Sequence, residues 1–309
     1  MMEIVRPHPE FRETILGFGE TDINLCYTCS SCVCECPINI ATNRLSPRTL
    51  VWMANLGLLD ELVNLPEIWY CLGCNRCSQI CPMTVKPANL ISCLQWEARD
   101  RRIVSKEIFE RYKILCSELH LIRWHLASKS MKDRNFSLNG VRWRELLEKP
   151  VSTTEETVSF ESLSADSREF KKAADNYLGD PTNASYCFTC GGCSSVCPVF
   201  YDRNIFDPLR ILRMANLRMR GDILDSPSIW LCLECERCTN ACTQRVKGHL
   251  IIRRLQELAL EQDFVDKNFP QRWQEIQKVL YIQFVEEIDF IFNFKQPEFE
   301  GKNRVANLL

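Results

Sequence analysis

CYTCSSCVCECP, residues 26–37, places five cysteines within eleven positions of a 309-residue chain that holds 19 cysteines in all. Disulfides explain this crowding poorly, because several cysteines on one short loop cannot all reach disulfide geometry with one another. The total is odd, and disulfide-rich secreted scaffolds are usually much shorter. The opening MMEIVRPHPEFRE has no apolar core of the kind that a signal peptide carries. We therefore expect a cytoplasmic protein whose thiols act as ligands.

The spacing within this stretch is C-x2-C-x2-C-x3-C, and it occurs four times in the chain. The motif cysteines are Cys26, Cys29, Cys32, Cys36, Cys71, Cys74, Cys77, Cys81, Cys187, Cys190, Cys193, Cys197, Cys232, Cys235, Cys238 and Cys242. Proline follows the first three motifs, whereas Thr243 follows the fourth. This run is the bacterial ferredoxin signature of [4Fe–4S] clusters, in which the fourth cysteine binds the other cluster of a pair. The sequence thus predicts four [4Fe–4S] clusters as cofactors.

Structural zinc is the alternative ligand. It usually takes two C-x2-C pairs separated by a longer stretch, because tetrahedral geometry needs two arms. Four ligands on one continuous loop fit that geometry poorly, so clusters are favoured. Ferredoxin precedent, rather than spacing alone, assigns the sets: Cys26, Cys29 and Cys32 with Cys81; Cys71, Cys74 and Cys77 with Cys36; Cys187, Cys190 and Cys193 with Cys242; Cys232, Cys235 and Cys238 with Cys197.

The four motifs belong to an internal repeat with a constant offset of 161 residues. Cys26 and Cys187 are related by this offset, and the sequence MANL at 53–56 returns at 214–217. The chain therefore reads as a tandem duplication over roughly 20–127 and 181–285. We expect a first domain over 1–128, a linker over 129–177, a second domain over 178–285 and a C-terminal tail over 286–309.

The segments between the motifs have helical patterns. Ser46-Pro47 and Asp207-Pro208 are N-terminal helix signals, because an N-cap side chain is followed by proline at the first helical position. Further helices are expected near 88–101 and 248–262. Apolar residues from 104 to 126 recur every three or four positions, which predicts a long helix in each copy. No long alternating strand and no membrane span are predicted.

The linker and the tail differ in composition from the two copies. The stretch PVSTTEETVSFESLSADSRE, residues 150–169, is rich in Ser, Thr and Glu and is expected to be exposed. It does not decide whether the copies are packed rigidly or tethered loosely. The tail carries Phe290, Ile291, Phe292 and Phe294. Packing of these residues on the second copy is favoured over docking onto a partner.

Several conspicuous residues have simple structural explanations. Cys34 is interpreted as a bystander beside the first loop, although it could compete with Cys36 as a ligand. Core packing is expected for Cys93 and Cys116. Surface or helix-packing roles are expected for His120, His125 and His249, since no cluster needs them. Trp69 and Trp230 precede the second motif of each copy, and we expect them to shield a cluster from water.

The helical segment between Cys36 and Cys71 resembles the helical ferredoxin domain found in the C subunit of heterodisulfide reductase and in the iron–sulfur subunits of succinate dehydrogenase and fumarate reductase. The match is closest to the heterodisulfide reductase C subunit, through residues 26–37, MANLGL at 53–58 and IWYCLGCNRCSQICP at 68–82. The resemblance covers both copies and implies a mainly α fold with two tandem helical ferredoxin domains, each binding two [4Fe–4S] clusters. The family usually has one copy, so the duplication is a departure.

This resemblance also implies a function. The chain would be an electron-transfer subunit of a multi-subunit heterodisulfide reductase-like oxidoreductase. Its partners would be a flavoprotein and a catalytic protein, similar respectively to the A and B subunits of heterodisulfide reductase. No Cys-Cys pair, no G-x-G-x-x-G loop and no C-x4-C-x2-C run occurs, so the chain looks like an electron relay without a substrate site. A free polyferredoxin and a structural iron–sulfur scaffold are the alternatives. A net charge of −2 without a basic block argues against nucleic acid.

Overall fold

The computed structural model describes residues 7–17, 21–138, 142–147 and 165–293. The part of the first copy before its long helix consists of short helices that connect the cysteine loops. They are α1 (Pro9–Gly17), η1 (Ile23–Leu25), α2 (Ser31–Cys34), α3 (Pro37–Thr42), α4 (Pro47–Asn55), α5 (Leu59–Val63), η2 (Pro66–Tyr70), α6 (Arg76–Gln79) and α7 (Pro87–Asp100). The long helix α8 (Lys106–Lys132) follows.

The second copy repeats this order. It contains η3 (Ala184–Tyr186), α11 (Gly192–Ser195), α12 (Pro208–Asn216), α13 (Arg220–Leu224), η4 (Pro227–Leu231), α14 (Arg237–Asn240), α15 (Gly248–Glu261) and the long helix α16 (Phe269–Phe292). Between the copies lie α9 (Trp143–Leu147), α10 (Ala165–Ala174) and the antiparallel strands β1 (Asn176–Tyr177) and β2 (Asp180–Pro181). The prediction of a mainly α fold is confirmed.

The helix starts follow the signals in the sequence. The Ser46 side chain accepts a hydrogen bond from the Thr49 amide at the start of α4. Asp207 does the same for the Leu209 amide at the start of α12. Each cap satisfies a backbone donor that the first helical turn leaves free. The same N-cap arrangement therefore begins the equivalent helix in both copies.

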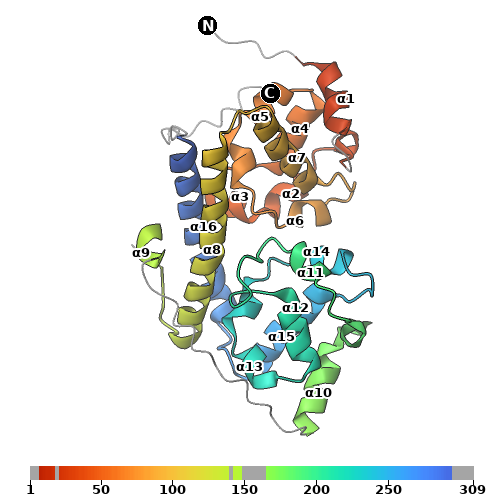
Figure 1. Cartoon of the computed structure of the whole chain (residues 1–309), viewed down its shortest axis with the longest axis vertical. Helices are drawn as coiled ribbons and strands as arrows, with labels where there is room; N and C mark the ends of the chain where they lie inside the picture. Colours follow the sequence, from red (N-terminus) through yellow and green to blue (C-terminus); the bar gives the residue numbers. More distant parts are fainter. Residues whose placement is uncertain (1–6, 18–20, 139–141, 148–164, 294–309) are drawn as a thin grey trace.

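The long helices α8 and α16 form an antiparallel pair that runs along both copies (Figure 1). The end of α8 meets the start of α16, where Arg272 donates to the Ser130 carbonyl at 2.8 Å. Helix α8 begins on its own copy and then packs against η4 of the second copy. Helix α16 begins on its own copy, where Phe269 packs on Trp230, and then packs on α3 and η2 of the first. Each long helix thus contacts both copies, and the pair connects them.

Phe292 packs on the first copy, not on the second as expected for the C-terminal aromatic residues. The Phe292 ring lies 4.9 Å from Trp69 and 5.9 Å from Tyr112, measured between centroids. Phe290 remains 65% exposed, and Phe294 lies outside the described residues. The reason is that α16 is long enough to leave its own copy and reach the other.

The expected linker is only partly described, since residues 148–164 lie outside the described ranges. Residues 129–132 belong to α8, and residues 165–169 begin α10, where Phe170 is buried. Within the described residues, no helix combines the length and the apolarity that crossing a membrane requires.

Candidate metal centres

The four cysteine loops share one backbone conformation. In each loop the residues directly before and after the second cysteine have a positive φ, between 55° and 81°. These residues are Thr28, Ser30, Gly73, Asn75, Thr189, Gly191, Glu234 and Glu236. Most are not glycine, and such residues adopt this conformation at a cost of roughly 1–2 kcal/mol each. Alternation of left- and right-handed residues turns backbone amides toward one side, which forms a concave site for an anion.

Backbone amides reach the sulfurs at equivalent positions in the two copies. The Gly73 amide donates to the Cys71 sulfur at 3.4 Å, and the Glu234 amide donates to the Cys232 sulfur at the same distance. In the first motif the Ser31 hydroxyl lies 3.4 Å from the Cys29 sulfur. Such donors favour the charged thiolate, which is the form that binds metal.

Cysteines from different motifs line common hollows. One hollow is lined by Cys26, Cys29, Cys32 and Cys81, together with apolar neighbours such as Val51, Val85 and Pro87. We call it the outer site of the first copy. A second hollow is lined by Cys197, Cys232, Cys235 and Cys238, with Val199, Phe206 and Ile252 beside them. We call it the inner site of the second copy. In both hollows three cysteines of one motif meet the fourth cysteine of the other.

The remaining motif cysteines form two further groups. Cys71, Cys74, Cys77 and Cys36 form the inner site of the first copy. Burial raises the pKa of Cys71 to about 12, and the neighbouring Cys74 and Cys36 add to the shift. The 161-residue offset relates Cys187, Cys190, Cys193 and Cys242 to the outer site of the first copy, and we call them the outer site of the second copy. Here Cys187 adds to the pKa shift of Cys193, which burial dominates.

Inner and outer sites differ in their exposure to water. Cys36, Cys74, Cys77 and Cys235 are buried, whereas Cys29 and Cys190, one in each outer site, are exposed. Burial raises the pKa of Cys36 to about 11 and that of Cys197 to about 12. These thiols are therefore protonated at neutral pH in the absence of metal, and metal binding would release their protons.

The donor set and the space around it suit a cluster. Every motif position offers sulfur, and no carboxylate is needed to complete a set of four. A β-carbon at Gly248 would lie only 3.1 Å from the Cys238 sulfur, so glycine keeps this side of the inner site open. Among the described residues, no group of three or more His, Cys, Asp or Glu side chains is placed to hold a metal ion. A cubane binds each thiolate at a separate iron, so its ligands lie farther apart than those around one zinc ion.

Thr243 does not change the turn after the last motif. The Thr84 amide donates to the Cys81 carbonyl at 3.2 Å, and the Arg245 amide donates to the Cys242 carbonyl at 3.0 Å. The same turn therefore forms with Pro82 and with Thr243. The prediction that Cys242 stays available as a ligand is compatible with this geometry.

Most of the other conspicuous residues do not line the two hollows described above. Cys34 is exposed, and Cys93 and Cys116 are half-buried. Trp69 and Trp230 are buried against aromatic residues of the long helices. His249 lines the inner site of the second copy, and its Nδ1 lies 2.7 Å from the Thr239 hydroxyl, a contact between α15 and α14. No sequence signal marks this role, since the first copy has Ala88 at the equivalent position.

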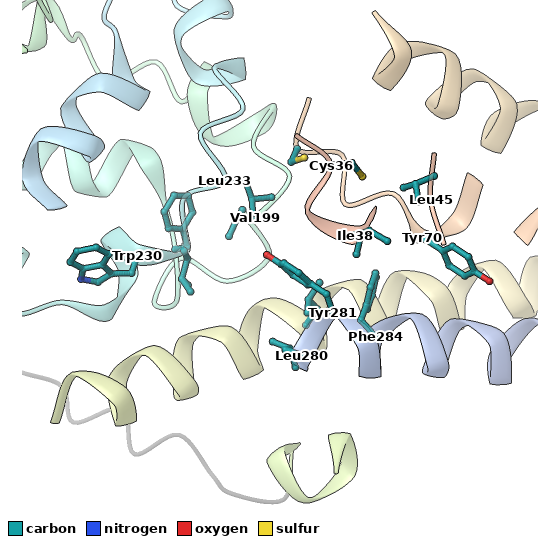
Figure 2. Packing of buried hydrophobic residues seen from close by; sticks show 14 of the residues in the cluster. Cys36, Ile38, Leu45, Tyr70, Val199, Trp230, Leu233, Leu280, Tyr281 and Phe284 are labelled. Atoms are coloured by element: carbon teal, nitrogen blue, oxygen red, sulfur yellow. The ribbon is translucent and has the colours of Figure 1, made fainter. Parts of the chain in front are cut away.

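The two copies meet at their inner sites. Arg76 donates to the Leu233 carbonyl at 3.4 Å, and Gln79 donates to the Glu234 carbonyl at 3.3 Å. Burial is the main cause that raises the pKa of Cys235, and Cys74 from the first copy adds to it. Figure 2 shows Tyr281 of α16 between Val199 and Leu233 on one side and Cys36 and Ile38 on the other. The second and fourth motifs are therefore neighbours across the boundary.

Sequence reasoning missed the arginines at this boundary. Arg76 and Arg237 follow the same cysteine in their motifs and are related by the 161-residue offset, so the repeat could have identified them. Arg237 favours the thiolate forms of Cys71 and Cys74 across the boundary. Arg123 is buried near the same place, but no motif marks it.

Comparison with known proteins agrees with this geometry. Residues 25–86 and 183–246 each match a family model described as a 4Fe-4S dicluster domain. These two ranges contain the four cysteine motifs, one pair in each range.

Similar proteins come from archaea. The chain is 33% identical over 92 residues to the C subunit of the H(2):CoB-CoM heterodisulfide,ferredoxin reductase of Methanothermobacter thermautotrophicus, covering 29% of this chain and 48% of that protein. It is 26% identical over 151 residues to an Archaeoglobus profundus protein named as similar to the heterodisulfide reductase C subunit, covering 49% and 74%. It is 30% identical over 108 residues to the iron-sulfur C subunit of the CoB--CoM heterodisulfide reductase of Methanopyrus kandleri, covering 34% and 52%.

The matched region spans about half the length of the first of these relatives. Both copies carry a dicluster domain, and all three relatives are named as the C subunit or as similar to it. The chain is an iron–sulfur protein similar to the C subunit of heterodisulfide reductase, with a 4Fe-4S dicluster domain in each copy.

Proposed function

We propose that this chain is an electron-transfer subunit of a heterodisulfide reductase-like complex and relays single electrons through four [4Fe–4S] clusters. Each cluster, when bound, would accept and donate one electron at a time. The observation that carries the proposal is the contact between the second and fourth motifs, which places the two inner sites next to each other. Without this contact the chain would hold two separate pairs of clusters.

The grouping of the sulfurs in the two hollows supports the following ligand sets. Each inner site takes three cysteines from the second motif of its copy and the last cysteine of the first motif. Each outer site takes three cysteines from the first motif and the last cysteine of the second. The hollows lined by four sulfurs support this exchange. The resulting order is outer site, inner site, inner site, outer site.

The two ends of this order are suited to contact with partners. Tyr27 and Phe188 are equivalent in the repeat, adjoin the outer sites and are 57% and 56% exposed. Exposed aromatic residues are common at the centres of protein interfaces. We propose that a flavoprotein similar to the A subunit of heterodisulfide reductase docks at one end, and that a catalytic protein similar to the B subunit docks at the other.

The first experiment is an iron and sulfide analysis of anaerobically purified protein, combined with an EPR-monitored redox titration. Four clusters require about sixteen iron atoms per chain. The Cys74→Ala variant should lose about four of them, whereas Cys93→Ala, a half-buried cysteine outside the motifs, should lose none. About eight iron atoms in the unmodified protein would contradict the proposal. Clusters that accept no electron at physiological potentials would leave only a scaffold.

The ligand exchange needs its own comparison. Cys36→Ala should remove the same EPR signal as Cys74→Ala, because both ligands belong to the inner site of the first copy. Cys32→Ala should remove a different signal, although Cys32 is closer to Cys36 in sequence. If Cys36→Ala and Cys32→Ala remove the same signal, the exchanged assignment is wrong.

A further inference from the structure

Arg123 of α8 is a buried cation without a carboxylate partner. Its side chain is 1% exposed, and among the described residues no Asp or Glu forms an ion pair with it. Its Nη2 donates to the Gln277 side chain at 3.0 Å, and its Nε has no hydrogen-bond partner. An arginine keeps its charge in proteins even when burial opposes it. A buried charge of this kind is strongly unfavourable unless a negative charge lies nearby.

The neighbour His120 cannot supply that negative charge. Its Nδ1 lies 3.3 Å from Arg123 Nη1, and burial together with Arg123 holds the pKa of His120 well below its usual value. The imidazole is therefore neutral, with Nδ1 as an acceptor. The ring also hydrogen-bonds to the Pro198 carbonyl, which only a ring N–H can do. His120 thus orients Arg123 and leaves its charge uncompensated.

The surroundings of Arg123 lead to the inner site of the second copy. The His120 ring stacks on Tyr201 at 5.6 Å and bonds to Pro198, the residue that follows Cys197. On the other side α8 packs against η4, which ends directly before Cys232. Two segments that lead to this site therefore lie against α8: the loop with Pro198 and Tyr201, which contacts His120, and η4. Burial lowers the pKa of Arg123 most, whereas Tyr281 and then Cys232 raise it, and Cys74 raises it less.

We propose that Arg123 is the buried counter-charge of the cluster in the inner site of the second copy and raises the reduction potential of that cluster. This inference rests on the cluster assignment in the proposed function. With its four thiolates the oxidised cluster carries roughly −2, and one added electron makes this roughly −3. A nearby cation stabilises the reduced state more than the oxidised state. Because the site is buried, solvent and salt screen this effect little.

The buried arginine of α8 has no counterpart in the other copy. The residue equivalent to Arg123 is Phe284 of α16, which is also buried. Two acidic residues of the fourth motif, Glu234 and Glu236, would lower the reduction potential of the same cluster. They are about 40% exposed and lie 3.9 Å from Arg253 and 3.5 Å from His249. Solvent therefore screens the effect of these two carboxylates on the reduction potential, whereas the effect of the buried Arg123 charge is screened much less.

The test is an EPR-monitored titration with dithionite as the electron donor, on anaerobically purified full-length protein. The signal of the inner cluster of the second copy is identified as the one that Cys235→Ala removes. Its presence in the unmodified protein tests the proposed function separately. Arg123→Met should then lower the midpoint of this signal, so that the reduced-to-oxidised ratio at the original midpoint falls at least tenfold, equal to 59 mV for one electron. Arg123→Lys should keep the midpoint close to the original.

Controls separate charge from packing. Phe284→Met changes the equivalent buried position without changing a charge, and it should leave this midpoint in place. A second neutral variant, Arg123→Gln, covers the case in which Arg123→Met loses the cluster. If both neutral variants lose the cluster while Arg123→Lys retains it, the result also supports a buried cation beside this cluster. The proposal is overturned if Arg123→Met retains all its iron with an unchanged midpoint, or if Arg123→Lys shifts or loses the cluster as much as Arg123→Met does.

Discussion

Asp289 shows how much can depend on a single buried carboxylate. It is 2% exposed and accepts hydrogen bonds from Tyr70 at 2.6 Å and from Arg44 in a bidentate ion pair. Both donors belong to the first copy, whereas Asp289 lies near the end of the chain. Sequence reasoning found all the motif cysteines, because their spacing is specific. It could not find this group, because its members are 219 and 245 residues apart and no local pattern marks them.

Removal of this carboxylate should be costly. We expect Asp289→Ala to lower the free energy of unfolding by about 3–5 kcal/mol, since the buried Tyr70 and the half-buried Arg44 would lose their acceptor. The control is Asp60→Ala, which removes an exposed partner of Arg101 and should cost no more than about 1 kcal/mol. Anaerobic thermal unfolding scans of both variants provide the comparison. Equal midpoints would show that the buried group contributes little.

At the scale of elements, the helices could be predicted but not their neighbours. The apolar stripe over 104–126 predicted a long helix, and α8 extends over Lys106–Lys132. A stripe reports only that one face is buried, not which surface covers it. The stripe therefore could not reveal that α8 and α16 each pack on both copies. The same limit explains why the aromatic residues near 290 were expected on the second copy.

The end of α16 offers a matched pair of phenylalanines. Phe292→Ala removes a ring that packs on Trp69 and Tyr112, so we expect a loss of about 2–4 kcal/mol in the free energy of unfolding. Phe290→Ala, two residues earlier in the same helix, removes a ring that is 65% exposed and should change stability by less than about 0.5 kcal/mol. Denaturant unfolding would measure both. A larger loss of unfolding free energy for Phe290→Ala than for Phe292→Ala would contradict the packing of the Phe292 face of α16 on the first copy.

At the scale of the whole molecule, the long helices should hold the copies together even without the covalent connection between them. We expect that a protease site inserted between residues 150 and 163 can be cut without separating the two fragments. The antiparallel pair of α8 and α16, and their contacts with both copies, should hold the fragments together. Native size-exclusion chromatography after cleavage measures this directly.

The control for this experiment is the same cleavable protein with Asp289→Ala and Phe292→Ala. Both substitutions remove contacts between α16 and the first copy. The fragments of this control should separate at a lower denaturant concentration. Separation of the unmodified fragments in plain buffer would mean that the copies are only tethered. Sequence reasoning left this question open, because linker composition does not report on contacts made elsewhere in the chain.

The presence of both copies in one polypeptide has a consequence for the direction of the proposed electron transfer. A homodimer of a single-copy protein repeats every side chain about its two-fold axis, so its halves are electrically identical. Here each half is encoded separately: Arg123 in one copy corresponds to Phe284 in the other, and Gly73 and Asn75 correspond to Glu234 and Glu236. In a symmetric electron relay the two ends are identical, so neither direction of transfer is favoured. This molecule repeats the order of helices and motifs in both copies, so under the proposed function its two ends could differ as the entry and exit points of electrons.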